Sequence, residues 1–538
     1  MRIAVIAPPY PLEEGPAPPL GICYVAAAFE KTGAEVRIFD FVVSGYSRKK
    51  LAALMEDFSP DAVGITSVTL NFHQAAAIIS DAKEISPGAV TMMGGPHVTF
   101  TAEETLASYP ALDLLVLGEG EETIAELMPV LGEKSAWKNV RGIMFRENGS
   151  LTATGPRPLI ADLDTLPLPA RRLLPINRYR AMGYPVSITT SRGCPHQCIF
   201  CQGRRLVGAK MRFRSVPAVA DEIEEILSLG FTRINVADDL FTARKERVLS
   251  FCETVRSRGL NFSWGAFSRV NTLDLETAKA MAGAGCDCVS FGLETGNQEM
   301  LDRIKKAATL EQARVAVDIC KQAGLLVHGS LIAGLPGETP RTLAESKEFA
   351  ESLNISHGWH KLAPFPGTTV MDRVADYDLE ILTRDWSLYD ANHAIVRTRA
   401  VSPEDIDEYV ADYDRTCARL WKELEDKMAD GTATPMERLR IEGTHRLPLI
   451  YAILSGDLIE KFGEGIEDSD PAGSLGILAG RISRETGADP DMTRRTLAFF
   501  AEKNMIRFAS GNGFPSWQWA PVAPRAQSRS TQLLAAAG

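Results

Sequence analysis

The chain has 538 residues, which is too long for one ordinary domain and predicts about two to four. It is 45% hydrophobic and 24% charged, as globular proteins are, and no apolar run approaches the roughly 18 residues that a membrane-spanning helix needs. Its net charge of −11 gives no support for a nucleic-acid-binding surface, which would be basic. We therefore expect neither a membrane nor a nucleic acid among its partners.

Residues 1–135 are predicted to form a first domain in which strands and helices alternate. The predicted strands are Arg2–Ala7, Glu35–Phe39, Ala62–Thr66, Val90–Gly94 and Leu114–Leu117. The predicted helices are Leu20–Thr32, Lys49–Asp57, His73–Ile85, Ala102–Ser108 and Glu121–Leu131. This order is typical of a parallel, doubly wound, Rossmann-like sheet, in which ligands bind beyond the carboxyl ends of the strands. Glycines stand at two such ends, although tight turns need glycine there as well.

The rest of the chain divides at changes of composition. Residues 136–185 contain two Pro-rich stretches and are expected to be a linker. Residues 186–370 return to strand–helix alternation with six predicted strands, which favours a partial (β/α)6 TIM-like barrel with its chemistry at the strand C-terminal ends. We expect a helical extension over 371–430, an α-rich unit resembling a winged helix over 431–520, and a disordered tail over 521–538.

Three cysteines, Cys194, Cys198 and Cys201, lie within one short loop after the first barrel strand. Thiolate sulfur selects iron–sulfur clusters, zinc or copper(I). A closed zinc site or a ferredoxin cluster needs four protein ligands, so three thiolates leave one metal position open for chemistry. The alternative is a structural zinc site with His196 as fourth ligand, but only one residue separates His196 from Cys198, which is awkward for a shared tetrahedron.

This spacing, Cys-x3-Cys-x2-Cys with Phe200 before the last cysteine, resembles that of the radical S-adenosylmethionine (SAM) enzymes. The resemblance implies that the three cysteines hold a [4Fe–4S] cluster and that SAM binds its fourth iron. It also implies that the reduced cluster cleaves SAM to a 5′-deoxyadenosyl radical. An external electron donor such as flavodoxin or ferredoxin is then required as a partner.

Further motifs of this family follow in the expected order along the barrel. The resemblance implies that SAM is bound by Phe200, Gln202, Asp238, Asp239, Ser268, Arg269, Glu294, Gly334, Leu335 and Pro336. Strand side chains alternate, so one of Asp238 and Asp239 should point into the barrel mouth and the other away. Helix capping by an aspartate and a structural ion pair for Arg269, with Glu294 as one candidate partner, remain open alternatives.

The first domain resembles the cobalamin-binding domain that precedes many radical SAM cores. The implied cobalamin contacts are Pro19, Leu20, Gly21, Tyr24, Ser67, Val68, Thr69, Leu70, Gly94, Gly95, His97, Gly118, Glu119 and Gly120. Free-standing corrinoid domains carry Asp-x-His-x-x-Gly, whose histidine ligates cobalt; here Asp40 and Gly45 match, but Val42 replaces the histidine. His73 and His97 are expected to be ordinary polar or capping residues and not cobalt ligands.

The resulting expectation is a cobalamin-dependent radical SAM enzyme that methylates an unactivated carbon of a small molecule or peptide. No single catalytic side chain is assigned. A radical SAM cyclase of the tetrapyrrole type and a non-catalytic corrinoid or iron–sulfur sensor are the alternatives. A methylthiotransferase is rejected because the first domain has only Cys23. The other cysteines look like buried free thiols, and the N-terminus reads as a strand and not a signal peptide, so we expect a cytoplasmic location.

Overall fold

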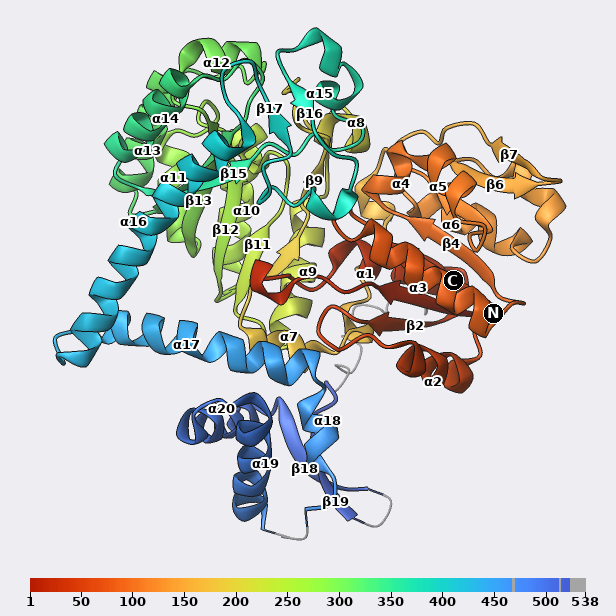
Figure 1. The fold of residues 1–538 in the computed structure, drawn as a ribbon. Coiled ribbons are helices and arrows are strands. Elements are labelled where there is room, and N and C mark those ends of the chain that lie inside the picture. Colours follow the sequence, from red (N-terminus) through yellow and green to blue (C-terminus); the bar gives the residue numbers. More distant parts are fainter. Residues whose placement is uncertain (467–469, 512–513, 523–538) are drawn as a thin grey trace.

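The computed structural model describes residues 1–466, 470–511 and 514–522 of the chain. Figure 1 shows a helix-flanked sheet in the red-to-orange N-terminal part, a second curved sheet in the yellow-to-green centre, and a blue helical part. No helix of the described residues is both long and apolar enough to cross a membrane. The predicted disordered tail lies outside the described residues from residue 523 onward.

The first sheet has seven strands in the order β2-β1-β3-β4-β5-β6-β7, of which the first five are parallel. Its parallel strands are β1 (Arg2–Ala7), β2 (Glu35–Asp40), β3 (Ala62–Thr66), β4 (Val90–Gly94) and β5 (Leu114–Val116). The helices between them are α1 (Leu20–Lys31), α2 (Arg48–Phe58), α3 (Phe72–Ile85), α4 (Pro96–Phe100), α5 (Ala102–Ser108) and α6 (Glu121–Leu127). The predicted order of strands and helices is confirmed.

Both faces of this sheet are covered, as the doubly wound prediction requires. Along β1, Ala4 and Ile6 belong to the apolar core shared with α2 and α3, whereas Ile3, Val5 and Ala7 belong to the core shared with α1 and α6. This alternation follows from the two-residue period of a strand. The carboxyl ends of β1, β3, β4 and β5 consequently form one edge of the sheet, where a ligand can be bound.

The expected linker over 136–185 contains a hairpin, which corrects that prediction. Strands β6 (Ile143–Glu147) and β7 (Ser150–Ala153) pair antiparallel and extend the first sheet beyond β5. Asn148 and Gly149 join them with positive φ angles of 48° and 83°, the geometry that an Asn-Gly hairpin turn favours. The two Pro-rich stretches that follow the hairpin, at 155–158 and 166–170, favoured a linker and hid this turn signal. The remainder of the range includes α7 (Ile176–Met182), which packs against helix α17 (Pro435–Ser455).

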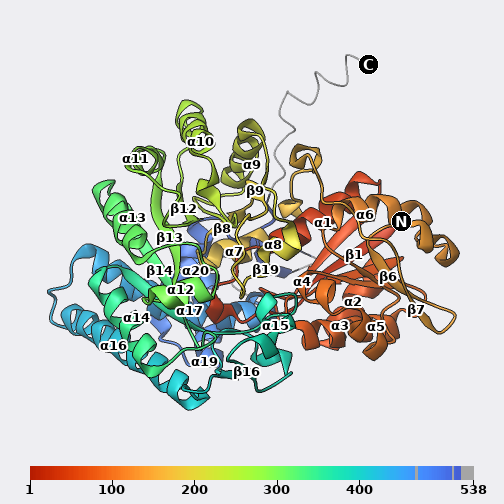
Figure 2. The same cartoon turned by 90° about the horizontal axis from the view of Figure 1, so that it is seen from above.

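The second sheet is parallel and has six strands in the order β15-β14-β13-β12-β11-β8. Its strands are β8 (Val186–Ile188), β11 (Arg233–Val236), β12 (Ser263–Ser268), β13 (Cys286–Glu294), β14 (Leu326–Ala333) and β15 (Ser356–Lys361). The helices on its outer side are α9 (Val216–Ser228), α10 (Lys245–Ser257), α11 (Leu275–Gly283), α12 (Gln298–Arg303), α13 (Leu310–Gln322) and α14 (Pro340–Ser352). Seen from above, the helices form an arc outside the strands, as in a partial barrel (Figure 2).

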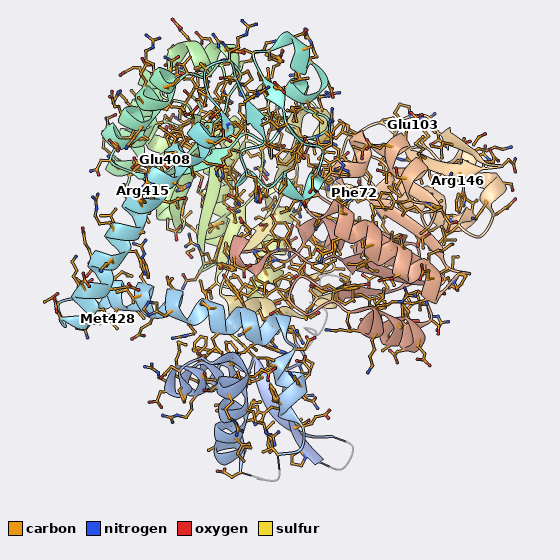
Figure 3. All side chains as sticks on the ribbon, in the orientation of Figure 1. Phe72, Glu103, Arg146, Glu408, Arg415 and Met428 are labelled. Carbon is orange, nitrogen blue, oxygen red and sulfur yellow. The ribbon has the colours of Figure 1, made fainter. Side chains whose placement is uncertain are left out.

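After the barrel, short elements lead into a helical C-terminal part. These elements are α15 (Thr369–Asp372), β16 (Glu380–Ile381) and β17 (Val396–Arg397). The helices are α16 (Pro403–Ala429), α17 (Pro435–Ser455), α18 (Leu458–Gly463), α19 (Pro471–Thr486) and α20 (Pro490–Glu502), followed by the hairpin β18 (Ile506–Gly511) and β19 (Phe514–Trp519). Helix α16 runs outward to Met428 at its far end, and α17 returns toward the body (Figure 3). Helices α18, α19 and α20 are followed by the hairpin β18–β19; the resemblance of this unit to a winged helix stays a prediction.

The C-terminal part is fastened to the first domain. Arg178 of α7 pairs with Asp457 at 2.8 Å and with Glu460, and also donates to the carbonyl of Val43 at 2.8 Å. Gly45 lies so close to α17 that a Cβ there would stand 2.4 Å from the carbonyl oxygen of Ser455. The loop that matches the corrinoid Asp-x-His-x-x-Gly motif therefore also serves as a packing surface for α17.

Candidate active site

The three cysteines lie on a loop between the two sheets. The loop connects β9 (Ser191–Arg192) to β10 (Arg212–Phe213), which pair antiparallel, and it contains the short helix α8 (Gly203–Val207). Figure 2 shows α8 between the barrel strands and the first sheet. The loop is tied to the C-terminal end of α12 and to α15, because Ile199 donates to the carbonyl of Ile304 at 3.1 Å and accepts from the amide of Val370 at 3.0 Å.

Local hydrogen bonds order the cysteine loop. The amide of Cys194 donates to the carbonyl of Gly208 at 3.0 Å, and Sγ of Cys201 accepts the amide of Gly203 at 3.3 Å. Burial raises the pKa of the Cys194 thiol and raises that of Cys201 to about 11. Metal binding must therefore displace protons from these thiols. No three His, Cys, Asp or Glu side chains of the described residues converge on a single ion; in a [4Fe–4S] cluster each thiolate binds its own iron.

The two aspartates after β11 point in different directions. Asp238 is fully buried and accepts 2.6 Å hydrogen bonds from the amide and hydroxyl of Thr190 and from the hydroxyl of Ser191, so it braces the strand that leads into the cysteine loop. A Cβ on Gly203 would stand 2.9 Å from Oδ1 of Asp239, which places that carboxylate beside the cysteine loop. Burial, and then the charge of Asp238, raises the pKa of Asp239.

Glu294 ends β13 with a positive φ of 64°, an uncommon conformation for a residue other than glycine. Its carboxylate pairs with Lys306 at 2.5 Å, and both side chains are less than 10% exposed. The sequence offered Arg269 as a partner for Glu294, but the structure corrects this. Arg269 instead donates to the carbonyls of Lys306 and Ala307 and, from Nη1, to Sγ of Cys198 at 3.8 Å.

Gly334 and Leu335, two further predicted SAM residues, are placed by backbone geometry. Gly334 has a positive φ of 92° and, with Leu335, donates its amide to the buried Glu338. Burial raises the pKa of Glu338 to about 8, so this carboxyl group is largely protonated at neutral pH. Sequence reasoning did not single out Lys306 or Glu338. A signal for Lys306 was available, because a buried glutamate such as Glu294 needs a partner of opposite charge.

Four other predicted SAM residues have mainly protein partners. Gln202 donates to the carbonyl of Pro366, and the hydroxyl of Ser268 is shared with Thr242 at 2.5 Å. Phe200 is half-buried against the main core, and the carbonyl of Pro336 accepts from Arg303 at 3.4 Å. The Ser268 hydroxyl is therefore already engaged within the barrel wall.

A cavity of about 300 Å³ lies at the carboxyl edge of the first sheet. Of the predicted cobalamin contacts, its lining includes Gly21, Gly94, Gly95, Gly118, Glu119 and Gly120. Its walls are mainly apolar, from residues such as Ile22 of α1, Met92 of β4 and Ile124 of α6. Arg192 at the end of β9 and Leu206 and Val207 of the cysteine loop close it on the barrel side. The cavity therefore adjoins the predicted cluster site.

The other predicted cobalamin contacts do not line this cavity. They are Pro19, Leu20, Tyr24, Ser67, Val68, Thr69, Leu70 and His97. Four of these residues, Ser67 to Leu70, form the loop that follows β3. Gly95 lies directly against this loop, because a Cβ there would stand 2.4 Å from the carbonyl oxygen of Ser67. Val68 is the member of that loop with an exposed side chain.

His97 is buried in an aromatic cluster. Its ring lies 4.1 Å from that of Phe72 and 5.2 Å from that of Trp386, and its Nδ1 is 3.3 Å from the hydroxyl of Thr69. Burial lowers its pKa to about 4, so the imidazole is neutral at physiological pH. Figure 3 shows Phe72 at the junction between the first domain and the segment that follows the barrel. Trp386 is therefore part of this packing between the first domain and the segment that follows the barrel.

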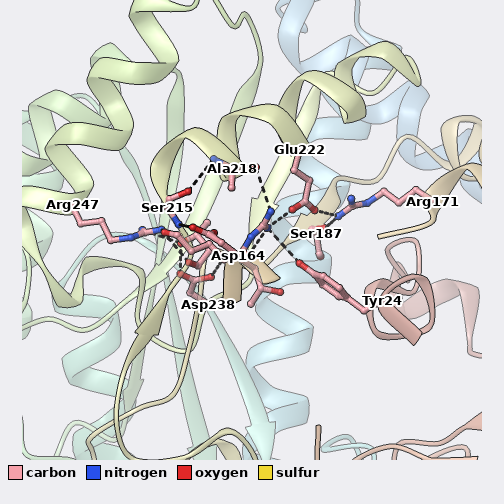
Figure 4. Close-up of polar contacts among 12 residues, drawn as sticks. Tyr24, Asp164, Arg171, Ser187, Ser215, Ala218, Glu222, Asp238 and Arg247 are labelled. Carbon is pink, nitrogen blue, oxygen red and sulfur yellow. Dashed lines mark hydrogen bonds and ion pairs between the residues drawn. The ribbon is translucent and has the colours of Figure 1, made fainter. Parts of the chain in front are cut away.

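A buried charge network joins the barrel to the first domain beside the cysteine loop (Figure 4). Glu222 of α9 is completely buried and pairs with Arg171 at 2.5 Å and with Arg214. Arg214 follows β10 and lies 3.4 Å from the hydroxyl of Tyr24 on α1. Tyr24, predicted as a cobalamin contact, thus takes part in this network, and the guanidinium of Arg192 stacks on its ring at 5.4 Å.

Comparison with known families agrees with this geometry. Residues 14–128 match the B12 binding domain, and residues 188–350 match the Radical SAM superfamily. The chain is 36% identical over 392 residues to an uncharacterized methyltransferase, PH0819, of Pyrococcus horikoshii, which covers 72% of this chain and 85% of that protein. It is 31% identical over 396 residues to the anaerobic magnesium-protoporphyrin IX monomethyl ester cyclase of Rubrivivax gelatinosus, covering 70% of each.

The fold is also found among solved structures. The cobalamin-dependent S-adenosylmethionine radical enzyme OxsB, solved with aqua-cobalamin and S-adenosylmethionine, superimposes with a TM-score of 0.66. The match covers 93% of this chain and 83% of that one at 19% identity, so it supports the fold alone. Together, the two domain matches and the 36% identical relative show that the chain belongs to the family of radical SAM enzymes that carry a cobalamin-binding domain.

Proposed function

We propose that this enzyme transfers a methyl group to an unactivated carbon of a small molecule or peptide. Its cofactors are a [4Fe–4S] cluster, SAM and cobalamin. The single observation that carries the proposal is the shared wall: Arg192 of β9, with Leu206 and Val207 of the cysteine loop, lines the cavity of the B12 binding domain. Together the cofactors supply a radical that activates a carbon–hydrogen bond and a methyl group that can be delivered to it.

The cysteine loop fits the cluster. Cys194, Cys198 and Cys201 provide three thiolates on one ordered loop, and none of them is used in a disulfide. Three ligands leave the fourth iron for SAM. Asp239, Arg269 and the segment that begins at Gly334 are the groups we assign to holding SAM, because they lie at the barrel's strand ends around that loop. Asp238 acts through the strand that it braces and is a positioning residue.

The cavity of the first domain fits part of a corrinoid. Glycines at the ends of β4 and β5 let a planar group approach the backbone closely, and the remaining walls are apolar. No histidine is among the residues that line it, and Val42 stands where free-standing corrinoid domains have a cobalt ligand. We assign the corrinoid to this cavity without a histidine ligand from the protein.

The enzyme also needs partners that its own chain does not provide. We assign the reducing electron to an external donor such as flavodoxin or ferredoxin, and the working location to the cytoplasm. None of the nine cysteines is paired in a disulfide, as expected in a reducing compartment. A ring-forming reaction with the same cofactors is the second candidate, and the 31% identity to a magnesium-protoporphyrin cyclase favours it.

The first experiment is anaerobic purification with cobalamin supplied, followed by iron, sulfide and corrinoid analysis. We expect about four irons per chain and about one corrinoid. Cys198→Ala should lose the iron, whereas Cys417→Ala, which alters an exposed cysteine outside the loop, should retain it. Iron without corrinoid would contradict the assigned cavity.

A second experiment separates the two reactions. SAM labelled in its methyl group is added with a reductant and candidate substrates. Methyl transfer predicts labelled product with both 5′-deoxyadenosine and S-adenosylhomocysteine. Formation of 5′-deoxyadenosine with an unlabelled, cyclised product and no S-adenosylhomocysteine would replace the methyltransferase assignment by the cyclase.

A further inference from the structure

Two arginines that flank the cysteine loop meet on one glutamate of the first domain. Arg192 and Arg212 are paired across the β9–β10 hairpin. Arg192 donates to Oε1 of Glu119 at 3.0 Å, and Arg212 donates to both carboxylate oxygens at 2.9 Å. The amide of Ile160 donates to Oε2 at 2.8 Å. Every strong acceptor position of this buried carboxylate is therefore engaged, and these partners lower its pKa despite its burial.

The same residues are boundaries of both cofactor sites. Arg192 and Glu119 line the cavity assigned to the corrinoid, and Arg192 is separated from Cys194 by Gly193 alone. Leu206 and Val207, which also line the cavity, belong to α8, the helix that begins two residues after Cys201. A displacement of this wall must therefore move the ends of the cysteine loop.

The loop has little room to absorb such a displacement. Gly193 has a φ of 108°, and a Cβ there would stand 2.4 Å from the carbonyl oxygen of Lys210. The amide of Cys194 is bonded to the carbonyl of Gly208, on the returning side of the same loop. Arg212 is additionally bonded to the carbonyls of Val207 and Ile160. The two strands and the loop thus move together, as one packed unit with the glutamate.

We propose that Glu119 is a positioning residue through which cluster assembly and corrinoid binding strengthen each other. Assembly of the cluster fixes the loop and holds Arg192 and α8 in place as the barrel-side wall of the cavity. A corrinoid in the cavity in turn holds that wall and the hairpin. Coupling of this kind is reciprocal. The inference rests on the proposed cofactor sites and adds the link between them.

The test measures corrinoid affinity in two forms of the full-length protein. Hydroxocobalamin is titrated into cluster-free and cluster-reconstituted protein, and binding is followed by absorbance. We expect the reconstituted form to bind about 5- to 150-fold more tightly, the usual range for coupled sites. Arg212→Gln is the decisive variant, because Arg212 holds Glu119 without being among the residues that line the cavity. In this variant, the reconstituted form should bind hydroxocobalamin less than about twofold more tightly than the cluster-free form.

Two further variants and a second readout keep the test specific. Glu119→Gln should remove the coupling in the same way, whereas Glu122→Gln, an exposed neighbour on α6, should keep the full ratio. Hydrogen exchange of residues 192–212 should slow when hydroxocobalamin is added to the cluster-free wild type, and less so in Arg212→Gln. Circular dichroism establishes that each variant is folded.

The outcomes separate the inference from the proposed function. Equal affinity in both wild-type forms, or an unchanged ratio in Arg212→Gln and Glu119→Gln, would overturn the coupling while leaving the cofactor assignment intact. A wild type that binds no hydroxocobalamin in either form would overturn both the cavity assignment and the coupling.

Discussion

Arg269 donates from Nη1 to Sγ of Cys198 at 3.8 Å, so a permanent positive charge stands beside one ligand of the assigned cluster. The same guanidinium holds the carbonyls of Lys306 and Ala307. It therefore fixes the loop between α12 and α13 to the cysteine loop. The contact is electrostatic as well as structural, and this distinguishes it from the neighbouring contact of Asn271 with the same Ala307 carbonyl.

Arg269→Gln should make the reduction potential of the cluster more negative. Removing a positive charge and a hydrogen bond to a sulfur disfavours the reduced, more negative cluster. The matched control is Asn271→Ala, which removes a donor to Ala307 and leaves the charge beside Cys198 unchanged. An EPR-monitored redox titration of the reconstituted proteins measures both. A positive shift in Arg269→Gln, or equal shifts in the two variants, would show that the charge does not act on the cluster.

Lys306→Gln should destabilise the protein by about 3 kcal/mol, because it leaves the buried carboxylate of Glu294 without its ion-pair partner. Lys305→Gln is the control, since Lys305 is an exposed neighbour on the same loop, and it should change the free energy of unfolding by less than about 0.5 kcal/mol. Chemical denaturation of the cluster-free proteins provides the comparison. Similar losses of unfolding free energy in both variants would mean that any change in this loop destabilises the protein, and not the loss of the Lys306–Glu294 pair.

Glu338 should give the protein a pH-dependent stability. Burial raises its folded-state pKa from 4.5 to about 8. Between these values the folded protein holds a proton that the unfolded chain releases, so this contribution to stability falls as pH rises from 4.5 through 8. The slope is at most about 1.4 kcal/mol per pH unit. Glu338→Gln keeps an acceptor for the amides of Gly334 and Leu335 and removes the titration.

The measurement for Glu338 is the difference in unfolding free energy between wild type and Glu338→Gln from pH 5 to 8. We expect the wild type to lose stability relative to the variant as pH rises. For Glu348→Gln, at an exposed position on α14, the difference in unfolding free energy from wild type should not change with pH. A constant offset between wild type and Glu338→Gln at every pH would refute the raised pKa.

Gly95→Ala should impair both folding and corrinoid binding. A φ of 109° is strained for alanine, which costs about 1–2 kcal/mol, and the added Cβ would stand 2.4 Å from the carbonyl oxygen of Ser67. Gly21→Ala is the contrasting change at the same cavity, because no atom lies within 4 Å of its added Cβ. It should stabilise α1 by about 0.5–1 kcal/mol. Thermal unfolding and hydroxocobalamin titration compare the two variants. Unchanged stability and corrinoid affinity in Gly95→Ala would contradict the close approach of Gly95 to the carbonyl of Ser67.

Much of the fold was predictable because its signals are local. The strands of both sheets follow runs of apolar residues, and β3 and β4 begin and end where the pattern predicts. The hairpin β6–β7 was missed even though Asn148 and Gly149 form a strong turn signal, because the neighbouring prolines favoured a linker. The cysteine triplet was recognised by spacing alone, since all its ligands lie within one loop.

The sequence by itself determined the two strand–helix series, the three thiolates of one loop and the missing histidine at Val42. Only the tertiary structure decided how charges pair between residues far apart in the sequence. Arg192 and Glu119 lie 73 residues apart, and the partner of Glu294 is Lys306 and not Arg269. Residue type and periodicity constrain neighbours along the chain, whereas a buried carboxylate accepts whichever cation the packing of several elements brings to it. That packing also placed the cysteine loop as a wall of the cavity in the first domain.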